Sequence, residues 1–187
     1  MSKVTIQGAA TGTGVFTLAS PATNTDRTLV LPDEAGTMAL QGGAGVGKVL
    51  QVVSTTSTTV TSTTSTSYVD VSGLALAITP TLSTSKILVI ASVNYSSSST
   101  GDNAFFRLMR DATSIGNGNS DICFGGRMGT TGGVQAGSIN YLDSPATTSA
   151  TTYKFQFRAD TATARVNERG ETGSDYSSHI TLMEIAG

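Results

Sequence analysis

The ten residues from Lys86 to Tyr95, KILVIASVNY, constrain the fold of this chain more than any other stretch. Seven of the eight residues from Ile87 to Asn94 are apolar or small, which is typical of a strand that is buried on both faces. We therefore predict that this run is the buried middle strand of a large β domain. It is far shorter than the ~20 apolar residues of a membrane span, so we expect no membrane insertion.

The composition predicts an all-β fold around this strand. Charged residues make up 13% of the chain, about half of the roughly 25% that soluble domains carry, and Ser and Thr dominate the polar positions. Thr favours strands, whereas Gly and Ser favour turns. No window shows the 3.6-residue period of a helix. About eight to ten short segments recur at a spacing of roughly 8 to 12 residues, a pattern typical of a β-sandwich or jelly roll.

The individual strands are predicted from alternation and turn residues. The Ser/Thr tract from Ser54 to Ser67 is interpreted as a hairpin, because Thr is a strand former, and Asp111 to Gly133 is predicted to be irregular. Long irregular segments in compact domains often bind something. The other predicted strands are Val49–Val53, Tyr68–Val71, Leu74–Thr79, Lys86–Tyr95, Ala104–Arg110, Val134–Leu142, a strand containing Tyr153, Phe155 and Phe157, and Ser178–Ile185.

The first 40 residues contain three apolar pieces that are too short to form a core. Three strands of three to five residues bury too little surface to offset the cost of ordering the backbone, roughly 1 to 2 kcal/mol per residue. We expect copies of the chain or another protein to cover them. The predicted division is an arm of residues 1–45 and a head domain of residues 46–187. The candidate anchoring residues of the arm are Val4, Ile6, Phe16, Leu18, Leu29 and Leu31.

The joint between the two parts, Gln41 to Lys48, resembles a phosphate-binding loop only in part. Gly42, Gly47 and Lys48 fit the spacing GxxxxGK. That motif continues with Ser or Thr and a helix, but here Val49 and a β segment follow. The Gly-rich stretch is therefore interpreted as a linker.

Charge and cysteine content exclude several functional classes. The net charge is −2 without a Lys/Arg cluster, so we expect no nucleic-acid partner. The single cysteine, Cys123, cannot form an internal disulfide, which favours assembly in a reducing cytosol. Met1 is not followed by the apolar core of a secretory signal.

The sequence gives little support for catalysis or for a metal or cofactor site. The single histidine, His179, lies in an apolar strand, where a structural role is favoured, and no GxSxG motif occurs. Ser83 and Lys86 fit SxxK without the companion motifs KTG or SDN. The acidic residues Glu168, Glu171 and Asp175 match no calcium-loop spacing and favour a solvated hairpin tip. We expect no catalytic residue, no metal and no cofactor.

Aromatic residues and polar loops remain as possible binding features. Phe105, Phe106 and the aromatic residues from Tyr153 to Phe157 could stack on sugars, but alternation places most of them in the core. Three polar segments could form a binding surface: Ser96–Asn103, Asp111–Gly133 and Glu168–Asp175. The candidate exposed binding residues in them are Asp102, Asn103, Asn117, Asn119, Asp121, Arg127, Glu168, Arg169 and Glu171.

Two parts of the chain resemble known proteins. The arm, VTIQGAATGTGVFTLASPATN followed by TLVLPDEAGTM, is similar to arms of tailed-bacteriophage fibre and other virion appendage proteins. The head resembles fibre-tip domains of marine and cyanobacterial phages over GKVLQVV, TSTSYVDVSGLALAITP, SKILVIASV, YLDSPATTSATTYKFQFRA and SSHITLMEIAG. Together these stretches cover most of the chain.

The resemblance implies a homotrimer of jelly rolls, similar to tumour-necrosis-factor and C1q heads, on an intertwined stem that docks on other virion proteins. Almost no shaft lies between Met38 and Val49, which favours a short appendage such as a capsid decoration, head fibre or short tail fibre. The expected location is the virion, assembled in the host cytoplasm. The alternatives are a tail-fibre tip that binds a host receptor or surface glycan, and an enzyme such as an esterase or depolymerase, which the lack of catalytic motifs disfavours.

Overall fold

A computed structural model describes residues 48–116, 118, 120–170 and 176–187. The predicted arm, its six anchoring residues and the boundary at residue 45 lie outside the described residues. Every regular element within them is a β-strand, and the described part contains no helix that could cross a membrane. The strands are β1 Val49–Ser57, β2 Thr61–Thr63, β3 Val69–Ile78, β4 Lys86–Ser97, β5 Asn103–Arg110, β6 Thr113–Ile115, β7 Phe124–Arg127, β8 Gln135–Asp143, β9 Thr151–Ala159, β10 Ala164–Val166 and β11 Ser178–Ile185.

The strand pairing is that of a jelly roll, which confirms the predicted fold class. Along the chain the first long strand pairs with the last, β1 with β11, and the next pairs are β3 with β9, β4 with β8 and β5 with β7. All of these pairs are antiparallel, so the chain forms one long ribbon of paired strands. The ribbon rolls up because β11 also pairs with β4 and β9 also pairs with β5. Eight strands connected in this way form the two Greek keys of a jelly roll.

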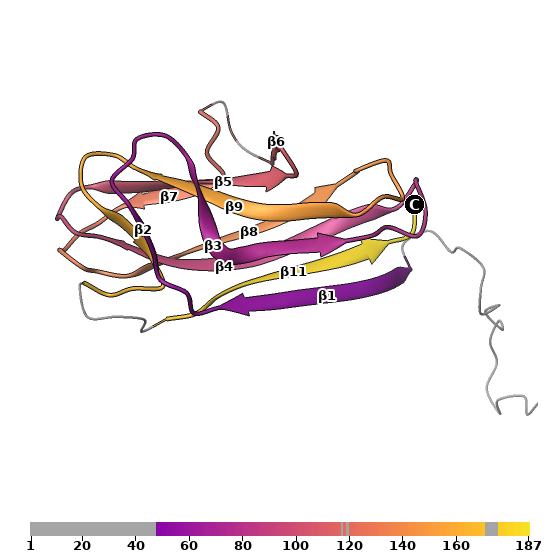
Figure 1. The fold of residues 1–187 in the computed structure, drawn as a ribbon, viewed down its shortest axis with the longest axis horizontal. Coiled ribbons are helices and arrows are strands. Elements are labelled where there is room, and N and C mark those ends of the chain that lie inside the picture. Colours follow the sequence, from indigo (N-terminus) through magenta and orange to yellow (C-terminus); the bar gives the residue numbers. More distant parts are fainter. Residues whose placement is uncertain (1–47, 117, 119, 171–175) are drawn as a thin grey trace, which may run out of the picture. The chain divides into compact units, whose positions relative to one another are not determined.

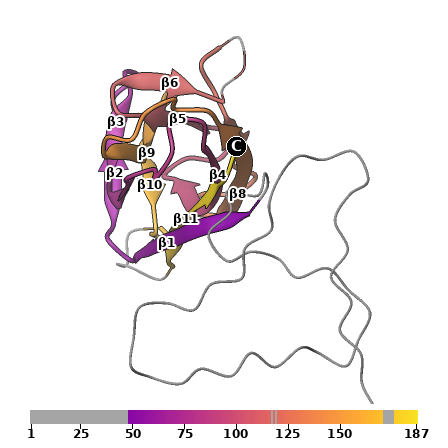
Figure 2. The ribbon, with the colours of Figure 1, turned by 90° about the vertical axis from the view of Figure 1, so that its right-hand side faces the viewer.

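The rolled ribbon has two layers, which Figure 2 shows from one end of the molecule. One sheet has the order β1-β11-β4-β8, and the short strands β10 and β2 extend it beside the end of β4. The other sheet has the order β3-β9-β5, and β7 and β6 follow one another along the far edge of β5, where they pair with its first and second halves. In Figure 1 the C-terminus lies beside the start of β1, where the Ala186 amide donates to the Lys48 carbonyl at 2.8 Å.

The core between the layers is apolar and rich in aromatic residues. The predicted central strand is confirmed as β4, which pairs with β8 along one edge and with β11 and β10 along the other. Phe106 and Leu108 of β5 belong to this core, and both are fully buried. Phe106 stacks on Phe124 and Phe157 at centroid distances of 4.8 and 5.7 Å. The rings account for much of the buried apolar area that stabilises the fold.

Three local predictions were wrong. The tract Ser54–Ser67 does not form a hairpin: β1 runs on to Ser57, and β2 pairs with β10 instead. The segments Tyr68–Val71 and Leu74–Thr79 belong largely to one strand, β3, whose pairing with β9 shifts between Asp70 and Ala75. The segment from Asp111 to Gly133 contains the strands β6 and β7. Alternation cannot show such pairing, because Thr and Gly fit both strands and turns.

A buried carboxylate fastens the end of the sandwich where β1 begins. Glu184 on β11 is fully buried. It accepts hydrogen bonds from the Gln51 side chain at 2.6 Å and from the Thr81 amide and hydroxyl at 2.7 and 2.8 Å. Burial alone would raise the pKa of Glu184, but the hydrogen bonds to the ionised form outweigh it and lower the pKa to about 2. The carboxylate therefore joins β1, β11 and the β3–β4 connection.

Candidate functional site

Parts of the three predicted binding segments come together at one end of the sandwich, which we call the loop end. The Gly101 amide donates to the Met128 carbonyl at 2.7 Å, and the Gly132 amide donates to the Ser97 carbonyl at 2.9 Å. The Ser96 hydroxyl donates to the Glu168 carbonyl at 2.6 Å. The loops after β4, β7 and β10 therefore form one continuous surface, as expected for connections at one end of a sandwich.

A shallow pocket of about 300 Å³ opens in this loop end, lined by Thr100, Gly101, Arg127, Met128 and Gly129. Arg127 was predicted as an exposed binding residue, and it is exposed. Its Nε donates to the Gly101 carbonyl at 3.0 Å, which holds the guanidinium beside the pocket. A cation over exposed backbone groups suits a small polar or anionic ligand.

Two other predicted residues at the loop end hold the loops together. Asp102 is only 4% exposed, so its prediction as an exposed residue was wrong. It accepts hydrogen bonds from Ser97 at 2.6 Å and from the amide and hydroxyl of Thr161 at 2.9 and 2.8 Å. Burial would raise the pKa of Asp102, but these hydrogen bonds lower it. Asn103 begins β5 and is half-buried, and its side-chain amide donates to Asp160 at 2.7 Å.

The segment after β10 is only partly described. Glu168 is half-buried and pairs with Arg165 at 3.4 Å, whereas Arg169 is exposed. Asn117, Asn119 and Glu171 lie outside the described residues.

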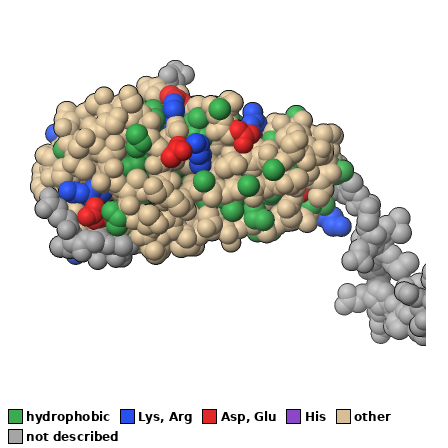
Figure 3. Space-filling model, viewed as in Figure 1, with side chains coloured by type: hydrophobic (Ala, Val, Ile, Leu, Met, Phe, Trp, Pro, Cys, Tyr) green, Lys and Arg blue, Asp and Glu red, His purple; other side chains and the backbone are tan. Residues whose placement is uncertain are grey.

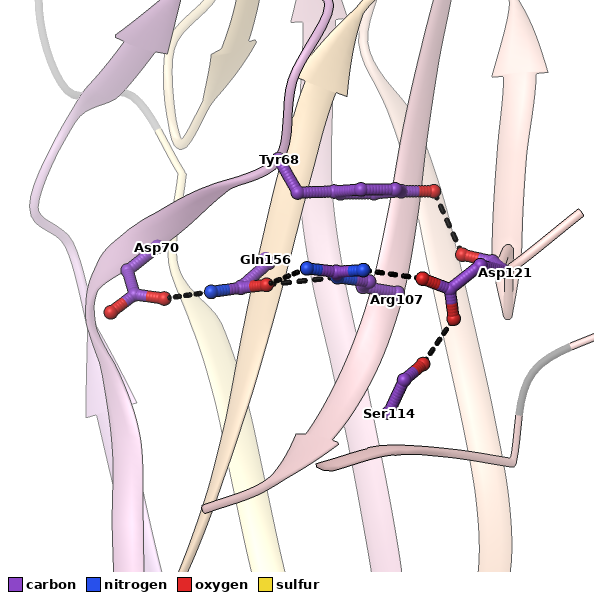
Figure 4. Close-up of polar contacts among 6 residues, drawn as sticks. All are labelled: Tyr68, Asp70, Arg107, Ser114, Asp121 and Gln156. Carbon is purple, nitrogen blue, oxygen red and sulfur yellow. Dashed lines mark hydrogen bonds and ion pairs between the residues drawn. The ribbon is translucent and has the colours of Figure 1, made fainter. Parts of the chain in front are cut away.

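The remaining predicted residue, Asp121, belongs to a different surface, the outer face of the β3-β9-β5 sheet, which we call the charged face. Its carboxylate pairs with Arg107 and accepts a hydrogen bond from Ser114. Arg107 also donates from Nε and Nη2 to the Gln156 side-chain oxygen at 2.8 and 2.6 Å. The Gln156 amide in turn donates to Asp70 at 2.6 Å. Figure 4 shows this chain of contacts crossing the sheet.

Two aromatic rings and a second arginine lie against Arg107 of this network or against one another, and sequence analysis did not identify them as a group. The Tyr68 ring lies 4.2 Å from the Arg107 guanidinium carbon, and its hydroxyl donates to the Asp121 carbonyl at 2.8 Å. The Arg158 guanidinium carbon lies 4.3 Å from the Phe105 ring and 5.6 Å from the Tyr68 ring. Burial raises the pKa of Tyr68, and Arg158 partly opposes that rise. We call Phe105, Arg158, Tyr68 and Arg107 the arginine–aromatic stack.

A sequence pattern could have identified the charged face. Lys154, Gln156 and Arg158 alternate on β9 with the buried Phe155 and Phe157, and register places Phe105 opposite Arg158. Of the aromatic residues considered as sugar platforms, Phe106, Tyr153, Phe155 and Phe157 are fully buried. Phe105 is half-buried and lies on the outer face.

The outer face of the other sheet, which we call the apolar face, has the opposite character. Val52 pairs with Met183, Met183 with Leu88, and Leu88 with Leu142, so one row of apolar side chains crosses all four strands. Val52 and Leu142 at its ends are 53% and 49% exposed. Within the four described strands, the outward-facing ionisable side chains are Lys86 and His179 at its margins. Figure 3 shows that most of the visible surface is neither apolar nor charged.

The described residues offer little for catalysis. His179 is exposed on the outer face of β11. Burial raises the pKa of the Cys123 thiol to about 12, which makes it a poor nucleophile at neutral pH. The described part of the chain contains no group of three or more His, Cys, Asp or Glu side chains that could hold a metal ion.

Comparisons with known proteins return similar solved structures, including two of infectious bursal disease virus, and no family. No protein family and no curated protein matches the chain. The structure of infectious bursal disease virus Gx strain is similar over 81% of this chain and 42% of its own, with 11% identity and a TM-score of 0.41. The crystal structure of the infectious bursal disease virus VP2 subviral particle is similar over 80% and 45%, with 12% identity and a TM-score of 0.41. The chain thus spans less than half the length of either.

Proposed function

We propose that this chain is a virion structural protein, a homotrimeric surface appendage of a tailed bacteriophage. In this proposal the arm of residues 1–45 attaches the protein to the capsid or tail, and the jelly-roll head of residues 46–187 is displayed outward. The protein assembles in the host cytoplasm and is a capsid decoration, a head fibre or a short tail fibre. It has no enzymatic role.

The observation that carries this proposal is the row of apolar side chains across the apolar face. Val52, Met183, Leu88 and Leu142 lie side by side in register, and a lone monomer would expose them to water. Contiguous apolar patches on soluble proteins commonly mark an interaction surface. Another copy of the same chain is the simplest cover, and in a threefold ring the apolar face of each copy packs against a different surface of the next copy.

Threefold symmetry and location on a virion are supported by the sequence resemblance. The similarity of the arm and head to phage appendage proteins implies three intertwined copies. The fold agrees with that implication, because the described head is a jelly roll, an architecture that virus capsid proteins share with other protein classes. Attachment through the apolar residues of the arm follows from their inability to form a core of their own.

Particle composition tests the proposal. Phage particles produced with the full chain should contain it in multiples of three copies, measured by quantitative mass spectrometry. Particles produced with a chain that lacks residues 1–45 should lose the protein, while the soluble head remains folded by circular dichroism. Absence of the full chain from purified particles, or retention of the truncated chain on them, would contradict the proposal.

A second candidate function, recognition of a host receptor or glycan, is favoured by the pocket at the loop end. Arg127 lines this pocket, and the variant Arg127→Glu reverses its charge. We expect this variant to reduce adsorption of the isolated head to host cells about tenfold or more, since a charged hydrogen bond contributes about 1.5 to 3 kcal/mol. If the original head and the Arg127→Glu head adsorb equally well, the pocket is not the site that binds the receptor.

A further inference from the structure

One arginine on the charged face is held in place without an acidic partner among the described residues. Lys154 pairs with Asp70 at 2.8 Å, and Arg107 pairs with Asp121. By contrast, no described carboxylate forms an ion pair with Arg158. Its Nη1 donates to the neighbouring Ala159 carbonyl at 3.4 Å, a long hydrogen bond. The charge of Arg158 is therefore not neutralised by the described residues of the sheet.

The acidic residue that directly follows β9 has another partner. Asp160 is the next outward residue after Arg158 on this side of the sheet, and it accepts a hydrogen bond from the Asn103 side chain at 2.7 Å. Its carboxylate is thus held toward β5 and forms no ion pair with Arg158.

The two rings of the stack fix the Arg158 guanidinium. Phe105 lies directly across from Arg158 in the β5–β9 register, and the guanidinium carbon is 4.3 Å from its ring. The Tyr68 ring lies 5.6 Å from the same guanidinium carbon, and the Tyr68 hydroxyl is anchored to the Asp121 carbonyl. An arginine that is stacked in this way has already lost much of its side-chain freedom, so it loses less entropy when it binds an anion.

We propose that Arg158, Phe105 and Tyr68 bind an acidic sugar through its carboxylate. The guanidinium fork matches a carboxylate with two parallel hydrogen bonds. The guanidinium lies over the half-buried Phe105 ring, and the part of the ring that it leaves uncovered offers apolar surface to the C–H groups of a sugar. Both Arg158 and Phe105 are half-buried, so part of each remains accessible to a ligand.

This site is separate from the proposed self-association and from the pocket. It lies on the outer face of the opposite sheet from the apolar row, and its basic residue differs from Arg127 of the loop end. The inference does not rest on the proposed function, because it is tested on the purified full-length chain without any particle.

The test is isothermal titration of the full-length chain with tetragalacturonate, with maltotetraose as the neutral sugar and acetate as the carboxylate without a sugar. We expect tetragalacturonate to bind at least tenfold more tightly than either control. Arg158→Gln should weaken this binding about tenfold, as for loss of a charged hydrogen-bonded pair. Phe105→Ala should weaken it several-fold, and Arg127→Gln should leave it within twofold.

Two further measurements keep the result interpretable. Arg158→Lys keeps the charge but loses the planar fork, so it should bind several-fold more weakly than the original chain. Circular dichroism and thermal midpoints show whether each variant is folded. Three outcomes would overturn the proposal: no binding of tetragalacturonate at millimolar concentration, equal binding of maltotetraose or acetate, or a loss caused by Arg127→Gln while the folded Arg158 variants bind normally.

Discussion

The two outer faces of the sandwich differ in how they meet water. On the charged face, the ion pairs Lys154–Asp70 and Arg107–Asp121 stand above the sheet, and Tyr68 covers part of this network. On the apolar face, a row of apolar side chains runs from Val52 to Leu142. Both faces belong to the same jelly roll and share one core.

The difference suggests separate tasks for the two faces. Paired charges on an exposed sheet keep it hydrated and discourage edge and face contacts. An apolar row that spans a whole sheet gains free energy when another surface covers it, at about 25 cal/mol per Å² of apolar area. We therefore expect copies of the chain to associate through the apolar face and the charged face to remain in solvent.

The largest expected effect comes from placing charge in the apolar row. The double variant Val52→Asp and Leu142→Asp should separate the assembly into single chains, because the interface would bury carboxylates without a partner. Both positions are about half exposed in the single chain, so its fold should tolerate the changes. Mass in solution, measured by light scattering, checks this expectation.

A matched control places the same charge on the other sheet. Ser72 is an exposed residue of β3, and Ser72→Asp should leave the mass unchanged. If the double variant keeps its mass, or if Ser72→Asp separates the chains equally well, the proposed division between the two faces is wrong.

An intermediate effect is expected when the pH is lowered, which should reduce the free energy of unfolding. The pKa of Glu184 is about 2, against an ordinary value of 4.5. Because the pKa is lower in the folded state, the ionised carboxylate stabilises the fold above pH 4.5, and this stabilisation is lost as the pH falls toward 2. The shift corresponds to about 3 kcal/mol. Urea unfolding at pH 6 and pH 3 should show a large part of this loss.

The variant Glu184→Gln tests whether the Glu184 carboxylate is responsible for the loss of stability in acid. This variant should have a lower free energy of unfolding at pH 6 than the original chain. Its free energy of unfolding should also change less between pH 6 and pH 3. A pH dependence as steep as that of the original chain would show that other carboxylates are responsible.

The smallest effect is expected on the charged face. Asp70 is paired with Lys154, but its side chain is 54% exposed. Exposed ion pairs contribute about 0 to 1 kcal/mol, so Asp70→Asn should lower the free energy of unfolding by less than about 1 kcal/mol, measured by urea at pH 7. A loss as large as that caused by Glu184→Gln would contradict the view that this face gives little stability.

The fold class and the central strand could be predicted from the sequence because burial leaves a strong pattern. The run Lys86–Tyr95 is apolar because one face of β4 fills the core and the other carries half-buried residues such as Leu88 and Ile90. Phe155 and Phe157 alternate with polar residues because β9 has one outer face in contact with water. The Ser/Thr tract was misread because its short strand β2 is held by β10, about 100 residues away. Local pattern carries no information on such a distant partner.

The candidate site was predictable only in part. Polar loops could be located, and Arg127 is exposed at the loop end, but Asp102 is buried because it accepts three hydrogen bonds that join two loops. The arginine–aromatic stack depends on the register that places Phe105 opposite Arg158. Tyr68, the residue just before β3, also contacts the stack, and nothing in the sequence pattern predicts this contact.

The measurement that tests the central claim most directly is the mass of the full-length chain in solution, by light scattering at micromolar concentration. The proposed assembly through the apolar face predicts a mass three times the 19.0 kDa of one chain. A mass of one chain would contradict it, because the row from Val52 to Leu142 would then remain exposed to water.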